Sequence, residues 1–302
     1  MKFIIKRFNS VELISFIYGL VTAIYILLFW NKIENPASLL LTRAVIFAAL
    51  FAAVFVAEKF PNVITNFLQY ALPFALIGYW YPETYYLNHG IYETGALAHL
   101  AGGAIVPNLD SFFDKVDIWM FGCSPAMEFS ALLPQAIVSE IMYFGYFAYY
   151  LIFIFVFSYF FFAKPHLAEK AMFVSLCSFF IFYILFIFIP ISGPQFYYLY
   201  PDNQVPDGYF FSKLMQGIQA AGEKPTGAFP SSHVGLTIIA MYLLFKQGRK
   251  YFYIILPVAI ILTASTVYIK AHYLIDVVAS FILTPIILFI SYRIFRLFKT
   301  TY

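Results

Sequence analysis

The strongest constraint on the fold is a succession of apolar runs, each close to twenty residues long. One such run covers residues 11–30, and similar runs recur to the end of the chain. A helix needs about 20 apolar residues to cross a hydrocarbon layer roughly 30 Å thick. Charged residues make up only 11% of the chain, whereas a soluble domain carries about 25%. The sequence therefore predicts a polytopic, all-α membrane protein.

The chain of 302 residues is predicted to form one membrane domain, residues 1–302, with eight spans. The first apolar run is too long for the core of a cleaved signal peptide, so we expect it to remain as a span. The predicted spans cover residues 11–30, 38–57, 62–80, 137–162, 171–190, 232–246, 251–269 and 273–296.

Basic residues set the predicted orientation. If the N-terminus is cytoplasmic and the spans alternate, twelve of the eighteen lysines and arginines fall on the cytoplasmic side, as the positive-inside rule requires. We therefore expect both termini in the cytoplasm. The net charge is only +3, and the basic residues are scattered rather than gathered in a stripe, so the sequence does not support nucleic-acid binding.

Two long segments, residues 81–136 and 191–231, lie on the opposite, non-cytoplasmic side in this topology. The first of them mixes apolar and polar residues without a full span. Short helices that lie in the membrane interface are the predicted structure. The chain thus places most of its extramembrane residues on one face.

Two of the five histidines stand in patterns that indicate chemistry. His233 follows Pro230, Ser231 and Ser232, where a loop turns into the predicted span 232–246. Proline and serine are typical of a helix start, because of the fixed φ of proline and the capping hydroxyl of serine. The free N–H groups and the positive end of such a helix form a natural cradle for a phosphate.

His272 opens the last span, and Asp276 follows four residues later on the same helix face. An imidazole paired with a carboxylate has a fixed tautomer and a stabilised cation, which a nucleophile or general base needs. The 39-residue interval from His233 to His272 fits a helical hairpin, so both histidines should finish on one membrane face. Taken alone, the His-Asp pair is equally compatible with a structural ion pair at a helix end.

These patterns resemble signature motifs of the type 2 phosphatidic acid phosphatase (PAP2) superfamily. Residues 230–233 read Pro-Ser-Ser-His and match the second motif, and residues 265–276 carry the Ser, His and Asp of the third motif at its spacing. The amino-acid sequences of residues 227–231 and 271–276 are similar to those of the inositol phosphorylceramide synthase branch, as is the Gly-Pro-aromatic stretch at 192–197.

The resemblance implies a six-helix core, which falls in residues 137–302 here, preceded by extra spans and the interfacial segment in residues 1–136. It also implies that His272 attacks phosphorus, that Asp276 holds the imidazole of His272, and that His233 protonates the departing oxygen. The implied donor is a membrane lipid phosphoester. The implied acceptor is water or the hydroxyl of an alcohol or a lipid.

The sequence departs from the family pattern where the phosphate should be bound. The Arg of the third motif is Thr266 here, and Gly193-Pro194 stands at the end of the missing Lys-and-Arg first motif. Lys270 and Lys224 are candidate replacements, although each is also compatible with an ordinary interfacial lysine. The residues that we expect to contact substrate are Lys270, Ser231, Ser232, Lys224, Gly193, Pro194 and Tyr197.

The sequence shows no carboxylate cluster of the kind that binds Mg²⁺ or Ca²⁺ and no Cys/His set for zinc, so we expect chemistry without a metal or cofactor. Similarity to the synthase branch favours transfer of a phospho-head group between lipids. Hydrolysis of a lipid phosphate or polyprenyl diphosphate is the alternative. A transporter is a remote alternative, because intramembrane acids mark transport pathways but no inverted repeat is visible.

Overall fold

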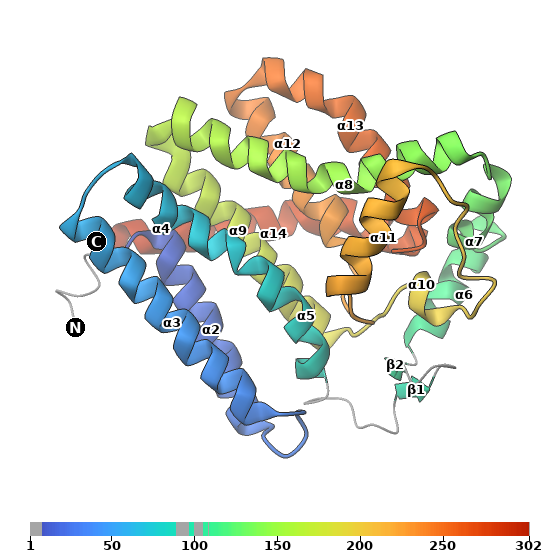
Figure 1. The fold of residues 1–302 in the computed structure, drawn as a ribbon, viewed down its shortest axis with the longest axis horizontal. Coiled ribbons are helices and arrows are strands. Elements are labelled where there is room, and N and C mark those ends of the chain that lie inside the picture. The colour runs from blue at the N-terminus through green and yellow to red at the C-terminus, as the bar shows by residue number, and fades with distance from the viewer. Residues whose placement is uncertain (1–7, 89–96, 100–104, 108, 302) are drawn as a thin grey trace.

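Most of the described chain is helical. The computed structural model describes residues 8–88, 97–99, 105–107 and 109–301, and Figure 1 shows how its helices are arranged. A short antiparallel ribbon pairs β1 (Leu97–His99) with β2 (Ile105–Pro107). The helices are α2 (Ser10–Leu28), α3 (Pro36–Lys59), α4 (Val63–Ala75), α5 (Ile77–Asn88), α6 (Leu109–Phe121), α7 (Pro125–Leu132), α8 (Ala136–Ser158), the π-helix η2 (Tyr159–Ala163), α9 (Pro165–Phe188), α10 (Pro194–Tyr197), α11 (Phe210–Gly222), α12 (Ser232–Gln247), α13 (Arg249–Tyr268) and α14 (Leu274–Thr301).

Six helices of the described chain are long and apolar enough to cross a membrane. They are α2, α3, α8 continued by η2, α9, α13 and α14. Each corresponds to a predicted span, and the predicted all-α membrane bundle is confirmed. The protein is therefore an integral membrane protein.

The two remaining predicted spans differ from the expectation. Residues 62–80 do not form one helix, because α4 ends at Ala75 and α5 begins at Ile77. Pro73 lies three residues before the break, and a proline removes one hydrogen bond of a helix and clashes with the preceding turn. The predicted span 232–246 forms as α12, but with 16 residues it is shorter than a typical span.

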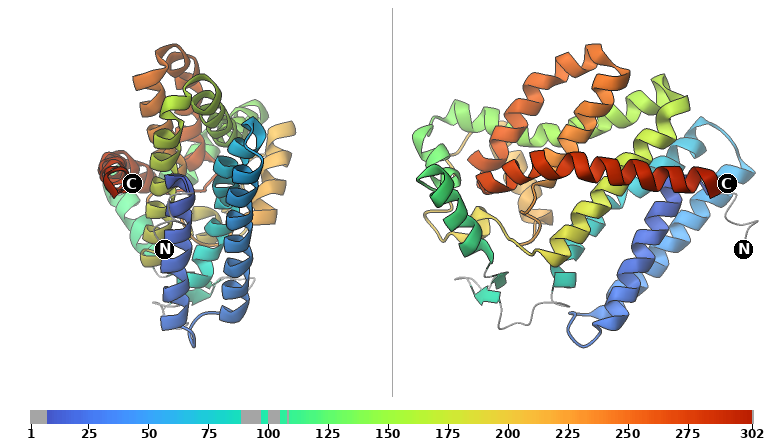
Figure 2. Two further views of the ribbon diagram at one scale, coloured as in Figure 1. Left: turned by 90° about the vertical axis from the view of Figure 1, so that its left-hand side faces the viewer. Right: turned by 180° about the vertical axis from the view of Figure 1, so that it is seen from behind.

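Helix α9 lies at the centre of the bundle. In its most apolar 18-residue stretch, 78% is buried inside the protein, the largest share of any candidate span in the described residues. A helix that is apolar all round is expected to be enclosed by others, and α9 contacts α2, α5, α12 and α14. Figure 2 shows α14, in red, crossing this bundle.

A buried ion pair joins α3 to α5. Both nitrogens of the Arg43 fork donate to the Glu83 carboxylate, at 2.8 and 2.7 Å. Tyr79 donates a further hydrogen bond to Glu83, and Trp80 lies under the guanidinium. Both charges are 2% exposed, so the pair is fully desolvated and bidentate, which fixes the relative position of the two helices.

The short helices α6, α7, α10 and α11 lie at the end of the bundle opposite the C-terminal end of α14 (Figure 1). Glu140 of α8 holds α11 in place, because its carboxylate accepts hydrogen bonds from the four amides of residues 209–212. These amides at a helix start have no partner within the helix. Short helices in the segment 81–136 agree with the sequence prediction, whereas α10 and α11 in the segment 191–231 were not predicted. The β ribbon is too short for a periodicity signal.

Candidate active site

The hairpin of α12 and α13 brings two histidines together. His233 is the second residue of α12, and His272 lies in the turn between α13 and α14. Their ring centroids are 5.7 Å apart at an interplanar angle of 63°. One phosphoester can therefore contact both rings.

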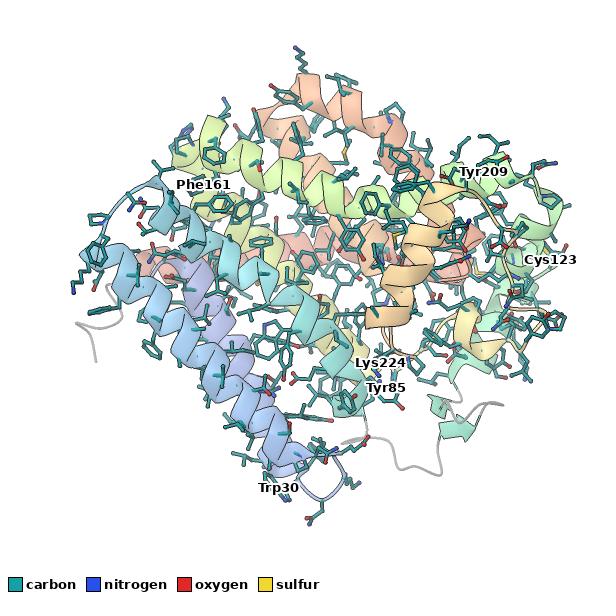
Figure 3. The ribbon with its side chains drawn as sticks, in the orientation of Figure 1. Trp30, Tyr85, Cys123, Phe161, Tyr209 and Lys224 are labelled. Atoms are coloured by element: carbon teal, nitrogen blue, oxygen red, sulfur yellow. The ribbon has the colours of Figure 1, made fainter. Side chains whose placement is uncertain are left out.

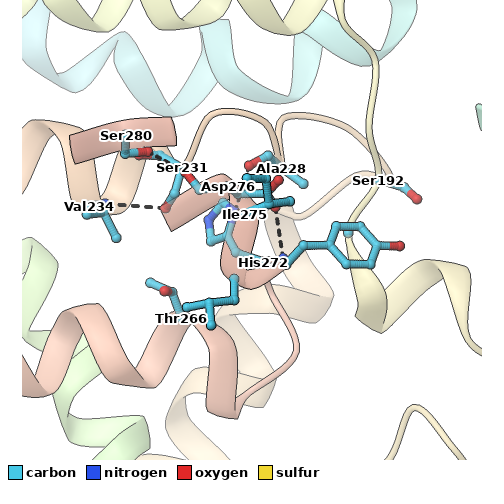
Figure 4. Close-up of polar contacts among 12 residues, drawn as sticks. Ser192, Ala228, Ser231, Val234, Thr266, His272, Ile275, Asp276 and Ser280 are labelled. Atoms are coloured by element: carbon cyan, nitrogen blue, oxygen red, sulfur yellow. Dashed lines mark hydrogen bonds and ion pairs between the residues drawn. The ribbon is translucent and has the colours of Figure 1, made fainter. Parts of the chain in front are cut away.

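The imidazole of His272 is held by a backbone carbonyl. Its Nδ1 lies 2.7 Å from the carbonyl oxygen of Ala228, and its amide donates to the carbonyl of Thr266 at 3.0 Å (Figure 4). Because a carbonyl only accepts hydrogen bonds, Nδ1 carries the proton and Nε2 keeps its lone pair. Burial lowers the pKa of His272 to about 4, although the bond to Ala228 raises it in part, so the ring is neutral near pH 7.

Asp276 lies beside His272, as expected from the four-residue spacing, but beyond hydrogen-bond distance. Its Oδ2 accepts a hydrogen bond from the Tyr273 amide at 2.8 Å and lies 3.6 Å from His272 Nδ1. That distance is too long for a hydrogen bond, and the two groups form an ion pair only when the ring of His272 carries a positive charge. The Ala228 carbonyl orients the ring in this structure. The Asp276 carboxylate is placed to stabilise positive charge that develops on the ring.

His233 lies between two tyrosine rings. Tyr146 is nearly parallel to it with centroids 4.6 Å apart, and Tyr149 lies at 4.5 Å. In the described part of the chain, Nδ1 of His233 is buried without a hydrogen-bond partner. The ring is thus fixed by packing and has hydrogen-bonding capacity left for a ligand.

An apolar cavity of about 580 Å³ opens beside His233. Its walls are aromatic and aliphatic side chains of α4, α5, α8 and α9. Glu223, Ser232 and His233 form its polar end. A largely apolar cavity with a few polar groups in its lining fits a molecule with a hydrocarbon chain and a polar head.

A carboxylate from α6 caps the start of α14. Asp117 accepts hydrogen bonds from the amides of Leu274 and Ile275 at 2.7 and 2.8 Å. Burial raises the pKa of Asp117, and these two bonds lower it in part. A negative group at this position is favoured by the positive end of the helix. The cap fixes the backbone two residues after His272.

A second carboxylate of α6 joins two loops of the site. Asp110 accepts hydrogen bonds from the amide and hydroxyl of Ser192, from the amide of Gly193, and from the hydroxyl of Tyr273. Burial raises its pKa to about 6, against the effect of these bonds. Sequence reasoning missed both aspartates of α6. Their seven-residue spacing, which places Asp110 and Asp117 on one helix face, was the available signal.

The Gly-Pro stretch packs against the turn that carries His272. Gly193 has φ +91°, and a Cβ atom there would lie 2.5 Å from the carbonyl oxygen of Ala271. Only glycine fits such a position. The amide of Gln195, in α10 (Pro194–Tyr197), donates to the carbonyl of Lys270 at 2.8 Å. This stretch supports the turn through its backbone.

The two candidate lysines are placed differently. Lys270 donates its ammonium hydrogens to the carbonyls of Asp202 and Gln204 at 2.5 and 2.8 Å. Its ammonium therefore binds the loop after α10. Lys224 is half-buried, and Figure 3 shows it near the C-terminal end of α5. Among the described residues, neither ammonium forms a hydrogen bond with His233 or His272.

The remaining predicted residues either support the backbone of the site or line the cavity. Ser231 caps α12 by accepting from the Val234 amide at 3.3 Å. Ser232 lines the cavity with His233. Tyr197 is half-buried, with its ring 5.2 Å from that of Tyr198. Among the described residues, no group of three or more His, Cys, Asp or Glu side chains could hold a metal ion.

Comparison with known proteins agrees with this site. A family model described as the PAP2 superfamily matches residues 117–290, from α6 into α14 and with both histidines. No curated protein and no solved structure matches the chain significantly. The family match does not distinguish the inositol phosphorylceramide synthase branch. Because it covers more than half of the 302 residues, the chain belongs to the PAP2 superfamily, which supports a phosphatase- or phosphotransferase-type activity on lipids.

Proposed function

We propose that the protein is a lipid phosphotransferase that moves a phospho-head group from a membrane lipid to an alcohol or lipid hydroxyl. The observation that carries this proposal is the hydrogen bond from His272 Nδ1 to the Ala228 carbonyl. It leaves Nε2 unprotonated beside His233. A neutral imidazole with a free nitrogen, oriented by its other nitrogen, is an activated nucleophile.

In the first step, the Nε2 lone pair of His272 forms a bond to phosphorus. The bond between phosphorus and the oxygen of the donor lipid breaks, and His233 gives that oxygen a proton, which it holds when the negative phosphate lies beside it. The phosphorylated ring of His272 is then cationic. Asp276, 3.6 Å from Nδ1, stabilises this charge.

In the second step, neutral His233 takes the proton of the acceptor hydroxyl. The acceptor oxygen bonds to phosphorus, and the bond from phosphorus to Nε2 breaks. His272 returns to its neutral form and His233 to its protonated form. The phosphate oxygens are held by the amides at the start of α12. The amides of Ser232 and His233 donate to none of the described residues. Such free amides at the start of a helix can bind an anion.

The cavity supports a lipid as substrate. Its apolar walls suit a hydrocarbon chain, and its polar end lies at His233. Helices from the N-terminal part, α4 and α5, line it together with α8, α9, α11 and α12. We therefore propose that residues 1–302 act as one membrane domain. His272 is 3% exposed, and such exclusion of water favours an alcohol acceptor over hydrolysis.

We further propose that the site faces the non-cytoplasmic side, with both termini in the cytoplasm. The distribution of basic residues supports this orientation. The C-terminal end of α14 lies at the other end of the bundle from α6, α7 and α10 (Figure 2). Tagging each terminus and testing its accessibility in sealed vesicles measures the orientation.

Turnover by the purified protein tests the proposed function. Lipid donors labelled at phosphorus are incubated with an alcohol or lipid acceptor in detergent, and the products are identified by mass spectrometry. We expect a new phospholipid and a trapped phosphohistidine, both lost in His272→Ala. The matched control is His166→Ala, because His166 is exposed at the start of α9. If free phosphate or a free phosphorylated head group forms and no new lipid does, the reaction is hydrolysis rather than transfer. Activity retained in His272→Ala would overturn the mechanism.

A further inference from the structure

Among the described residues that line the cavity, Glu223 is the one carboxylate. Glu223 follows α11 as its C-terminal cap and lines the cavity with Ser232 and His233. We propose that Glu223 binds hydroxyl groups of the head group that is transferred, and so selects hydroxylated phosphodiester lipids. This inference rests on the proposed function and adds the chemical class of the head group.

The carboxylate of Glu223 is held by neutral donors. Gln195 donates at 2.8 Å, Gln219 donates at 3.2 Å, and the hydroxyl of Tyr146 donates at 3.4 Å. No lysine, arginine or histidine within the described ranges forms an ion pair with it. Burial raises the pKa of Glu223, although the three partners lower it. Four hydrogen bonds from these three groups reach its two oxygens, because Gln219 donates to both. A carboxylate accepts about four such bonds, so a ligand hydroxyl in the cavity would replace one of the long contacts at 3.2 to 3.4 Å.

The charge of Glu223 determines what can lie beside it. Direct contact with a phosphate is disfavoured, because two negative groups close together repel each other. Hydroxyl groups fit, because a carboxylate accepts their hydrogens in strong, charge-assisted bonds. The surrounding glutamine amides and the phenol of Tyr146 form the kind of polar cluster that also binds hydroxyls.

Tyr146 connects this cluster to the reacting groups. Its ring stacks on His233 with centroids 4.6 Å apart, while its hydroxyl donates to Glu223. His233 in turn lies next to His272. Glu223 is therefore one tyrosine ring away from the histidine pair. A head group attached to phosphorus at the histidines can extend to the carboxylate.

The experiment compares three dioleoyl donors with the purified wild-type protein and Glu223→Gln. Phosphatidylglycerol has two head-group hydroxyls, phosphatidylethanol has the same charge and none, and phosphatidylcholine has a quaternary ammonium. We expect the wild type to prefer phosphatidylglycerol over phosphatidylethanol in kcat/KM by about 10- to 100-fold, the range for one hydrogen bond to a charged group. In Glu223→Gln, the ratio of kcat/KM for phosphatidylglycerol to that for phosphatidylethanol should fall close to one.

Glu128→Gln is the matched control, because Glu128 is exposed on α7, and it should keep the wild-type preference. Equal turnover of phosphatidylglycerol and phosphatidylethanol by the wild type would overturn the inference even if Glu223→Gln did not fold. A preference for phosphatidylcholine, or an unchanged preference in Glu223→Gln, would overturn it as well. Failure of the proposed function would look different, because the wild type would then form no new lipid from any of the three donors.

Discussion

Replacing Asp276 by Asn separates its charge from its structural contact. The asparagine oxygen can still accept the Tyr273 amide hydrogen, now at 2.8 Å, so the start of α14 should stay capped, because Asn and Asp are similar caps. The charge beside His272 is lost. For unit charges 3.6 Å apart, the interaction is about 4.6 kcal/mol at an effective dielectric constant of about 20. We therefore expect kcat to fall by roughly 10³-fold.

The assay is steady-state turnover of a labelled donor, together with the yield of phosphohistidine. Size-exclusion profile and thermal stability should match the wild type. Asp207→Asn is the control for the same chemical change, since Asp207 is exposed in the loop before α11. Asp276→Asn with more than about a tenth of the wild-type kcat would show that the Ala228 carbonyl suffices and would refute the charge argument.

Three further results are expected. Asp117→Asn should lower kcat by about 10- to 100-fold with little change in KM, because one charge-assisted bond that fixes the turn after His272 is lost; a change confined to KM would contradict this. Since burial lowers the pKa of His272 to about 4, the neutral nucleophile persists as pH falls, so the acid limb of kcat/KM should lie near pH 4; a limb near 6.5 would point to an exposed ring. Excess EDTA should leave turnover unchanged, and activity restored by titrating Mg²⁺ would argue against metal-independent chemistry.

The long spans could be predicted because each carries its own signal. A run such as residues 171–190 is apolar throughout, and it appears in the structure as the central helix α9. The span 62–80 failed, because hydropathy does not register the break between α4 and α5 after Pro73. Length and hydropathy describe one segment at a time, whereas helix breaks depend on a few backbone hydrogen bonds.

The site was predictable only as far as side-chain spacing reveals it. His233 and His272 stand in recognisable patterns, but the acceptor of the His272 proton is the carbonyl of Ala228. Every residue has a carbonyl, so no sequence pattern distinguishes this one. Lys270 illustrates the opposite case, since its spacing suggested a phosphate contact while its ammonium binds loop carbonyls in the structure. Spacing gives the face of a helix and does not give the hydrogen-bond partner.

The buried Arg43–Glu83 pair has a consequence for biogenesis. Arg43 enters the membrane within α3, and its partner lies in α5, forty residues later in synthesis. An unpaired arginine in a span opposes insertion by up to about 2.5–3.5 kcal/mol. A nascent chain that stops before residue 83 should therefore insert α3 less efficiently than one that includes α5. The arginine is therefore synthesised before its counter-ion, and we expect α3 to insert stably only after α5 has followed it.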